Sequence, residues 1–407
     1  MIDDDIGNRR EVDGNRREVD GNRRAVDGNR REVDGNRRAV DGNRYAIDGK
    51  STSAAVRDAT PSDDRGGASD APSAAGDRTR FFFSLTPEQI LDAVESAGEQ
   101  TTGVCYALNS LENRVYEVEL EGGGRVVGKF YRPGRWSDET IRDEHRLLAA
   151  LAEHEIPVCA PLRFGDPRDT LHHTREGIRF ALFPRMGGRS PDELFADDYH
   201  QLGRLLAQIH NVSASLELQH RPALTPQTYG RDRLDDILAF GDMPAALEQR
   251  YAATVERLIE LGEQRYARAL EGTRLFVAHA DCHRANLLRR DGFYFLDFDD
   301  AAVAPAAQDL WLLLPARPTD CPKELEELLE GYEQFRSFDQ RQLGLIEVLR
   351  GLRYVRYVGW VARRYEDPAF SRAFPHFGSE TYWQQQLIDV AEQVELLERA
   401  EQPYSWG

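Results

Sequence analysis

Three polar residues in the second half of the chain have the types and the spacing that phosphoryl transfer needs. Asp281 is followed five positions later by Asn286, and Asp297 comes eleven positions after Asn286, behind a short apolar run. Transfer of a phosphoryl group needs a carboxylate that orients the attacking hydroxyl and accepts its proton, together with hard oxygen ligands for Mg²⁺. This order predicts that Asp281 is the catalytic base. It also predicts that Asn286 and Asp297 are ligands of Mg²⁺, with Asp297 counted as catalytic as well.

A tight hairpin is expected between Asn286 and Asp297. Two short apolar runs, 287–288 and 293–296, flank an Asp-Gly pair at 291–292. An Asp-Gly pair in this setting is a strong signal for a β-hairpin, because both residues accept the backbone angles that the turn requires. Such a hairpin folds Asp297 back beside Asn286.

A second chemistry is open for the same loop. His279, Asp281 and His283 stand at alternate positions, and imidazole and carboxylate groups are common ligands of zinc and iron in metallohydrolases. Aspartate, histidine and asparagine also occur as turn formers and caps with no chemical role. Residues elsewhere in the chain must decide between these interpretations.

The deciding residues lie upstream, in a predicted strand and the helix after it. Lys129 lies in a predicted strand at 125–131, and it is one of only three lysines in a chain that otherwise uses arginine for positive charge. Fifteen residues later, Glu144 lies in a helical pattern introduced by Ser137. A lysine on a strand paired with a glutamate on the next helix is the arrangement by which kinases hold ATP phosphates. A metallohydrolase has no use for this pair.

Five segments carry a resemblance to a known family. They are 108–116, 129–133, 279–286, 297–301 and 308–311. From about Phe81 nearly to the C-terminus, the chain resembles the bacterial stress response kinase A family of serine/threonine kinases. The resemblance implies an α+β, bilobal protein kinase-like fold of the aminoglycoside phosphotransferase and choline kinase type. In that fold a β-rich N-lobe with the hinge covers 81–189, and a mostly helical C-lobe covers 190–407.

The resemblance also implies roles for single residues. Asp281 becomes the proton acceptor, Asn286 and Asp297 the Mg²⁺ ligands, and Ser110, Lys129 and Glu144 the ATP-binding residues. The chain has no G-x-G-x-x-G motif, so the turn at 108–116 would cover the phosphates with backbone N–H groups and the Ser110 hydroxyl.

Two residues depart from the family pattern. Ala280 stands where the family usually has glycine, which we expect to exclude a backbone angle reserved for glycine, and Gly128 replaces a bulkier strand residue.

Other segments are given supporting roles. The run 180–189 is expected to be the hinge that sandwiches adenine. His279 and His283 are expected to brace the loop, and Asp309 to tie it to a helix N-terminus. Asp299 and Asp300 are candidates to enlarge the metal site, and the alternative for Asp299 is a cap or a brace. The helix predicted at 345–365 carries five arginines, and we expect them to form a solvated basic face rather than a substrate groove. They are Arg350, Arg353, Arg356, Arg363 and Arg364.

Residues 1–80 are expected to be a disordered tail. They hold a seven-residue repeat with one glycine and one apolar residue in each copy, followed by a stretch rich in Ser, Ala, Asp, Gly and Pro. This tail has 16 basic and 17 acidic residues, so the net charge of −18 belongs to the rest of the chain. An acidic protein of this kind is not expected to bind nucleic acid.

Composition also predicts where in the cell the protein is found. No apolar run is long enough to span a bilayer, the N-terminus is charged, and the four cysteines are scattered, so we expect a reduced cytoplasm and no membrane. Together with these bounds, the family resemblance implies a monomeric, ATP- and Mg²⁺-dependent serine/threonine protein kinase of the stress response, able to autophosphorylate and acting on protein substrates. The alternative is a small-molecule hydroxyl kinase of the same fold, acting on an aminoglycoside, choline or homoserine. A distant alternative is the metallohydrolase built on His279, Asp281 and His283.

Overall fold

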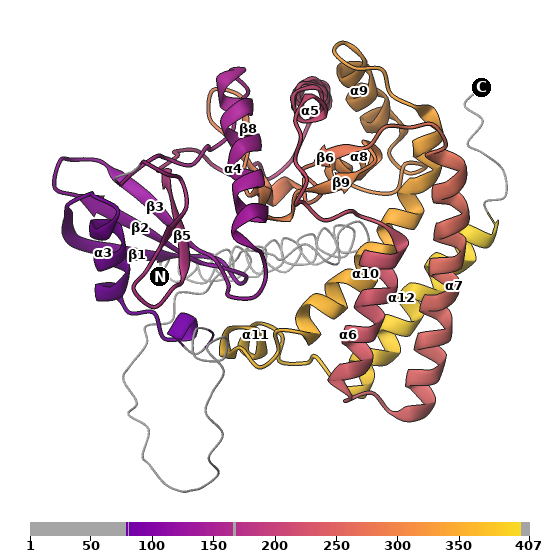
Figure 1. Ribbon diagram of the computed structural model, residues 1–407. Helices are drawn as coiled ribbons and strands as arrows, with labels where there is room; N and C mark the ends of the chain where they lie inside the picture. The colour runs from indigo at the N-terminus through magenta and orange to yellow at the C-terminus, as the bar shows by residue number, and fades with distance from the viewer. Residues whose placement is uncertain (1–78, 80, 166–167, 400–407) are drawn as a thin grey trace, which may run out of the picture. The chain divides into compact units, whose positions relative to one another are not determined.

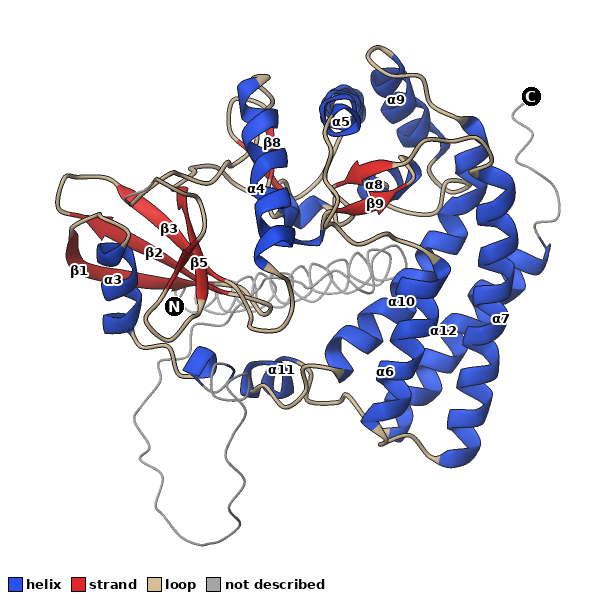
Figure 2. Ribbon diagram, viewed as in Figure 1, coloured by secondary structure: helices blue, strands red, loops and turns tan. Residues whose placement is uncertain are grey.

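The computed structural model describes residues 79, 81–165 and 168–399. The tail predicted at 1–80 therefore lies outside the described residues except for Thr79, as do the last eight residues of the predicted C-lobe. A five-stranded antiparallel sheet is followed by a mostly helical part (Figures 1 and 2). The predicted α+β, kinase-like fold class is confirmed. Among the described residues, no helix combines the length and the apolar character needed to cross a bilayer.

The sheet contains β1 (Thr101–Leu108), β2 (Arg114–Leu120), β3 (Arg125–Phe130), β4 (His172–His173) and β5 (Arg179–Pro184). Its strand order is β1-β2-β3-β5-β4, and every neighbouring pair is antiparallel. In β3, Lys129 is paired with Val115 on one side and Ala181 on the other, so it lies on a central strand. A central strand is a rigid support for a functional side chain.

Helix α3 (Pro87–Ser96) packs its apolar stripe on the sheet. Thr86 and Gln89 form a capping box, and Pro87 occupies the first turn, which together fix where the helix begins. Ile90 and Val94 are fully buried in one cluster with strand residues such as Val118.

Helix α4 (Asp138–Glu153) begins at Ser137, whose hydroxyl accepts a hydrogen bond from the Thr140 N–H. The helix presents Glu144 and His145 to the protein interior, where both are buried. The Tyr131 hydroxyl and the His145 ring nitrogen Nε2 are 2.9 Å apart, and Nδ1 is 2.9 Å from the Thr170 hydroxyl. These contacts fix the face of α4 that carries Glu144.

Ten helical elements make up most of the second part. They are α5 (Ala196–Ser215), η1 (Pro226–Arg231), α6 (Asp232–Phe240), α7 (Ala245–Ala269), α8 (Ala307–Leu313), α9 (Pro322–Glu333), η4 (Gln340–Leu345), α10 (Ile346–Ala362), α11 (Pro368–Ala373) and α12 (Glu380–Arg399). Helices α7, α10 and α12 lie side by side (Figure 1). A Cβ atom at Gly351 of α10 would stand 2.7 Å from the Leu258 side chain of α7, so only glycine permits this close approach.

Residues 314–322 form a turn of their own. The carbonyl oxygen of Arg317 accepts hydrogen bonds from the backbone N–H groups of Asp320 at 2.8 Å and Cys321 at 3.1 Å.

Two small sheets carry the loops of the candidate site. Strand β6 (Phe276–Ala278) pairs with β9 (Ala302–Ala304), and β7 (Leu287–Arg289) pairs with β8 (Phe293–Phe295). Residues 279–301 therefore form one long connection between β6 and β9, and the pairing of these two strands holds its ends together. The short turns η2 (Arg284–Asn286) and η3 (Phe298–Asp300) lie within it.

Candidate active site

The predicted hairpin between Asn286 and Asp297 is present. Leu287 is paired with Phe295 across β7 and β8, and the Leu296 N–H donates to the Asn286 carbonyl oxygen at 2.9 Å. The hairpin therefore returns the chain to Asn286 one residue before Asp297, as its Asp-Gly turn predicted.

Asp309 holds the beginning of the loop. Its fully buried carboxylate accepts hydrogen bonds from the backbone N–H of His279 at 2.9 Å and of Ala280 at 2.8 Å. The ring of His210 is 2.9 Å from the same carboxylate, and its other ring nitrogen is 2.8 Å from the Tyr332 hydroxyl. Burial alone would raise the pKa of Asp309, but the hydrogen bond and charge of His210 hold the pKa below its usual value. Asp309 therefore ties the loop to α5 and α9, as a brace.

The expectation for Ala280 is wrong. Ala280 adopts a φ of 64°, in the left-handed region, where we expected its Cβ to exclude such an angle. An L-residue there costs about 1–2 kcal/mol, so the surroundings must impose the conformation. Asp309 binds the Ala280 N–H, and the Gln308 side chain donates to the Ala280 carbonyl at 2.8 Å. Hydrogen bonds on both sides of the residue hold the alanine where the family usually has glycine.

Three side chains surround the carboxylate of Asp281. Arg353 Nη1 lies 2.7 Å from Oδ1, while His283 Nε2 at 3.4 Å and Asn286 Nδ2 at 3.3 Å approach Oδ2. Burial by itself would raise the pKa of Asp281, but His283 and Arg353 hold the pKa well below its usual value. The group is thus an ionised hydrogen-bond acceptor at neutral pH.

Two of the three candidate zinc or iron ligands are engaged with other groups. The His279 ring lies 2.9 Å from the Leu296 carbonyl oxygen, and Asp281 is bound by Arg353. Within the described part of the chain, the one cluster with metal-like donor spacing is formed by His200, Glu327 and Glu330, away from this loop. The geometry therefore disfavours the metallohydrolase interpretation.

Lys129 lies at the centre of a carboxylate cluster. Its Nζ is 3.4 Å from Glu144 Oε1, 3.3 Å from Asp297 Oδ1 and 3.2 Å from Asp299 Oδ1, so the predicted pair with Glu144 is present. Burial would lower the pKa of Lys129, but Asp299, Glu144 and Asp297 hold the pKa well above its usual value. The ammonium group is permanently charged in this site.

Asp299 acts as a brace rather than as an exposed acidic group. Its side chain is only 4% exposed, and it binds Arg135, Lys129 and the Asn113 amide. Asp297 is different, because 57% of its side chain is exposed. Of the acidic residues after the hairpin, Asp297 is thus the one available to a ligand.

A cavity of about 360 Å³ opens beside Lys129. Ser110 from the β1–β2 turn, Lys129, Glu144 and Asp297 all line it, together with apolar side chains and residues 183–186 of the predicted hinge. The lining apolar groups include Leu108, Val115, Val127, Leu148, Phe183, Leu288 and Phe295. Asp281 and Asn286 lie outside this lining. Leu296 is part of the lining, and its N–H donates a hydrogen bond to the Asn286 carbonyl oxygen, so Asn286 lies beside the cavity.

His145, which is buried next to Glu144, gives a testable pH dependence. Burial and the neighbouring Lys129 lower the pKa of His145 to about 3, from 6.5. Below pH 6.5 the His145 ring is protonated in the unfolded chain, whereas in the folded protein it stays neutral down to about pH 3. The free energy of unfolding therefore decreases as the pH falls from 6.5 toward 3. The expected loss is roughly 1.4 kcal/mol per pH unit.

The measurement is the free energy of unfolding between pH 7 and pH 4.5 for wild type and for His145→Gln. The variant should lose this component of the slope, whereas His154→Gln, at an exposed ring, should keep it. Parallel pH curves for all three proteins contradict the assignment.

The basic face predicted for α10 is not solvated, and this expectation is also wrong. The side chains of Arg350, Arg353 and Arg364 are 4%, 13% and 13% exposed, and that of Arg356 is 21% exposed. Only Arg363, at 50%, faces solvent to a large extent. Arg353, Arg356 and Arg364 pair with carboxylates on other elements, which periodicity within one helix could not reveal.

Known proteins resemble this chain in sequence and in fold. The phosphotransferase enzyme family model matches residues 106–346. The stress response kinase A of Escherichia coli K12 is 37% identical over 320 residues, covering 78% of this chain and 95% of that protein. A Salmonella typhimurium protein named serine/threonine protein kinase RdoA is 36% identical over 79% of this chain.

A solved structure shares the fold. The amicoumacin kinase hAmiN, in complex with AMP-PNP, Ca²⁺ and Ami, has a TM-score of 0.57 and 17% identity, covering 73% of this chain and 94% of that one. The family match spans more than half of the chain and the curated relatives are matched over nearly their whole length. The chain therefore belongs to the phosphotransferase enzyme family and, within it, to the stress response kinase A family of kinases.

Proposed function

We propose that this kinase transfers phosphate from ATP to serine or threonine hydroxyls of proteins, with Mg²⁺ as cofactor. The observation that carries the proposal is the contact of Lys129 with both Glu144 and Asp297 at the wall of one cavity. A strand lysine held by a helix glutamate and facing a metal-binding aspartate is the arrangement that positions ATP phosphates in kinases.

The cavity has the character of a nucleotide site. Apolar side chains such as Val115, Val127 and Leu288 can enclose the adenine ring, and the backbone at 183–186 can read its edge. The Lys129 ammonium and the Ser110 hydroxyl lie in the same lining and can bind the phosphates. The site thus offers an apolar region for the base and a cationic region for the phosphates.

Asn286 and Asp297 fit the requirements of Mg²⁺. The Asn286 amide nitrogen donates to the Asp281 backbone at 2.9 Å, which leaves the amide oxygen to act as a ligand, and the Asp297 carboxylate is exposed. Both are hard oxygen donors. When bound, Mg²⁺ supplies positive charge that neutralises the phosphate oxygens.

Asp281 is assigned to the acceptor hydroxyl. Arg353 fixes one carboxylate oxygen, and Oδ2 can accept a hydrogen bond from the serine or threonine hydroxyl. The hydroxyl oxygen forms a bond to the γ-phosphorus while the bond to the β-phosphate oxygen breaks, ADP leaves, and Asp281 receives the hydroxyl proton. Lys129 retains its charge throughout.

The substrate class is argued from the relatives. One relative is named a serine/threonine protein kinase and others are named stress response kinases, so we propose a protein substrate, autophosphorylation and a cytoplasmic stress response for this chain. The second candidate is a small-molecule hydroxyl acceptor, because the amicoumacin kinase shares the fold of this chain.

The test is incubation of the full chain with γ-labelled ATP and Mg²⁺. Generic proteins, small alcohols and aminoglycosides serve as acceptors, and the position of the label is mapped. Label on serine or threonine of the chain itself or of an added protein is expected. Label confined to small alcohols or aminoglycosides contradicts the protein kinase assignment.

A further inference from the structure

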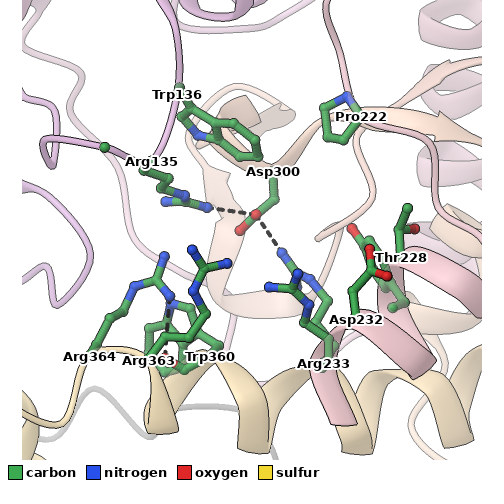
Figure 3. Close-up of a pocket in the computed structure, with 13 residues that line it drawn as sticks. Arg135, Trp136, Pro222, Thr228, Asp232, Arg233, Asp300, Trp360, Arg363 and Arg364 are labelled. Carbon is green, nitrogen blue, oxygen red and sulfur yellow. Dashed lines mark hydrogen bonds and ion pairs between the residues drawn. The ribbon is translucent and has the colours of Figure 1, made fainter. Parts of the chain in front are cut away.

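A second cavity, of about 310 Å³, carries an unusual number of cations. Five arginines line it, against two aspartates, Asp232 and Asp300. The arginines are Arg135, Arg233, Arg356, Arg363 and Arg364. They come from the loop after β3, from α6, from α10 and from the turn directly after α10, so separate segments converge on one space. Figure 3 shows the guanidinium groups of Arg135, Arg363 and Arg364 pointing toward this space below Asp300.

Some of these arginines are held by carboxylates. Arg135 and Arg356 both bind Asp300, and Arg364 binds Glu112 at 2.7 Å. These pairs fix the walls of the cavity. They are structural contacts, and they leave the remaining two arginines to be considered.

Arg233 and Arg363 are poorly compensated. Both approach the same carboxylate, that of Asp236, at 2.9 Å from Arg233 and at 3.7 Å from Arg363. The buried Nε of Arg233 has no hydrogen-bond partner in the described part of the chain. Asp236 is therefore the ion-pair partner of both cations, while Asp232 in the lining adds a weaker attraction for Arg233.

The lowered pKa values of two arginines indicate the same excess of positive charge at the cavity. Burial and, after it, the neighbouring Arg363 and Arg356 lower the pKa of Arg233, although Asp236 opposes them. Burial, with Arg135 and Arg132 close by, lowers the pKa of Arg364 to about 10 in spite of Glu112. A shift in this direction means that the charged form is disfavoured where it stands. An anion in the cavity would remove that penalty.

The cavity lies next to the candidate base. On α10, Arg353 binds Asp281, and Arg356, three residues further, lines the cavity and binds Asp300. The charge of Asp281 acts to raise the pKa of both Asp300 and Arg356, which places the two contacts near each other. A substrate with its hydroxyl on Asp281 has the cavity within reach of its adjacent groups.

We propose that this arginine cavity binds a phosphate ester carried by the phosphoryl acceptor. Guanidinium groups match phosphate oxygens with paired hydrogen bonds, and the two poorly compensated cations suit a dianion. A polycationic acceptor such as an aminoglycoside is repelled by the same lining. The inference rests on the proposed function, because it deepens the choice of acceptor at that site. The ester belongs to a phosphoserine near the target residue or to a small phosphorylated alcohol.

The first experiment measures binding without catalysis. Inorganic phosphate is titrated by calorimetry into the full chain saturated with AMP-PNP, which blocks the nucleotide site. Arg363→Gln should weaken phosphate binding about tenfold, the typical loss for one charge-assisted hydrogen bond. Arg257→Gln is the matched control, because Arg257 is 45% exposed on α7 and pairs with Glu398. Equal phosphate affinity in all three proteins, or no binding to wild type, overturns the proposal whether or not the chain is a kinase.

The second experiment distinguishes the two sources of the ester. Serine peptides with and without one phosphoserine, glycerol 3-phosphate and an aminoglycoside are compared as acceptors. A lower KM for the phosphopeptide than for its unphosphorylated form identifies a protein source, and preferred labelling of glycerol 3-phosphate identifies a small one. In either case Arg363→Gln should raise that KM about tenfold with kcat nearly unchanged, because Arg363 does not touch Asp281. Preference for the unphosphorylated peptide or the aminoglycoside overturns the proposal. If the chain transfers no label but binds phosphate through Arg363, the kinase assignment is refuted and the assignment of the cavity as a phosphate site stands.

Discussion

Replacing Asp281 with asparagine is expected to remove phosphoryl transfer and to leave nucleotide binding nearly intact. The amide cannot accept the hydroxyl proton, and Asp281 lies outside the lining of the nucleotide cavity. General-base assistance is worth about 10²–10⁴ in rate. The substitution also removes the negative partner of Arg353, whose side chain is 13% exposed, so the orientation of the loop suffers as well.

The measurement for Asp281→Asn is kcat with labelled ATP, beside the dissociation constant of the nucleotide and a thermal melt. Asp291→Asn is the control, because Asp291 stands at the hairpin turn with 87% of its side chain exposed. Retention of more than half of the wild-type turnover by a folded Asp281→Asn protein means that the base is another group.

Asp297→Ala is expected to lose Mg²⁺-dependent nucleotide binding and, with it, turnover. The change removes the exposed carboxylate beside Lys129, while Glu144 and Asp299 still hold the lysine in place. The loss therefore reports on the metal site and not on collapse of the cluster. Asn286→Ala should act in the same direction more mildly, because it removes a neutral ligand.

The metal site is tested by titrating Mg²⁺ against nucleotide binding in wild type, Asp297→Ala, Asp297→Asn and Asn286→Ala. Asp297→Asn keeps one oxygen ligand without its charge and should fall between wild type and the alanine variant. Mg²⁺ titrations that coincide for all four proteins refute the ligand assignment. Hydrolytic activity with Zn²⁺ and no ATP would instead favour the metallohydrolase.

The parts of the site that sequence could predict are those encoded by short-range patterns. The Asp-Gly turn at 291–292 predicts the hairpin that brings Asp297 back to Asn286. A single lysine on a strand before a capped helix predicts the ion pair with Glu144. These signals depend on turn chemistry and periodicity, which local sequence determines.

The parts that sequence missed depend on contacts between distant segments. For Asp299 the sequence predicted a place in the metal site or a role as a cap or brace, but it could not identify Lys129 and Arg135 as the partners of that brace. The arginines of α10 were expected to be solvated, because charge on a helix is usually exposed. A weak signal existed, since Arg350, Arg353 and Arg356 recur at spacing three and so share one side of the helix. Which carboxylates they meet is decided only when α10 packs.

The brace formed by Asp309 has a consequence for the motions of the loop. Its partner His210, which also contacts the Tyr332 hydroxyl, belongs to a helix of the core, and the N–H groups of His279 and Ala280 donate to its buried carboxylate. Freeing those two amides leaves His210 as the partner of the buried carboxylate, and each lost hydrogen bond costs about 1–3 kcal/mol. The first residues of this loop therefore cannot open by a local fluctuation of low free energy, as surface loops do. Their opening breaks two buried hydrogen bonds to the helical core, so the backbone before Asp281 is expected to keep its conformation while the acceptor enters and leaves.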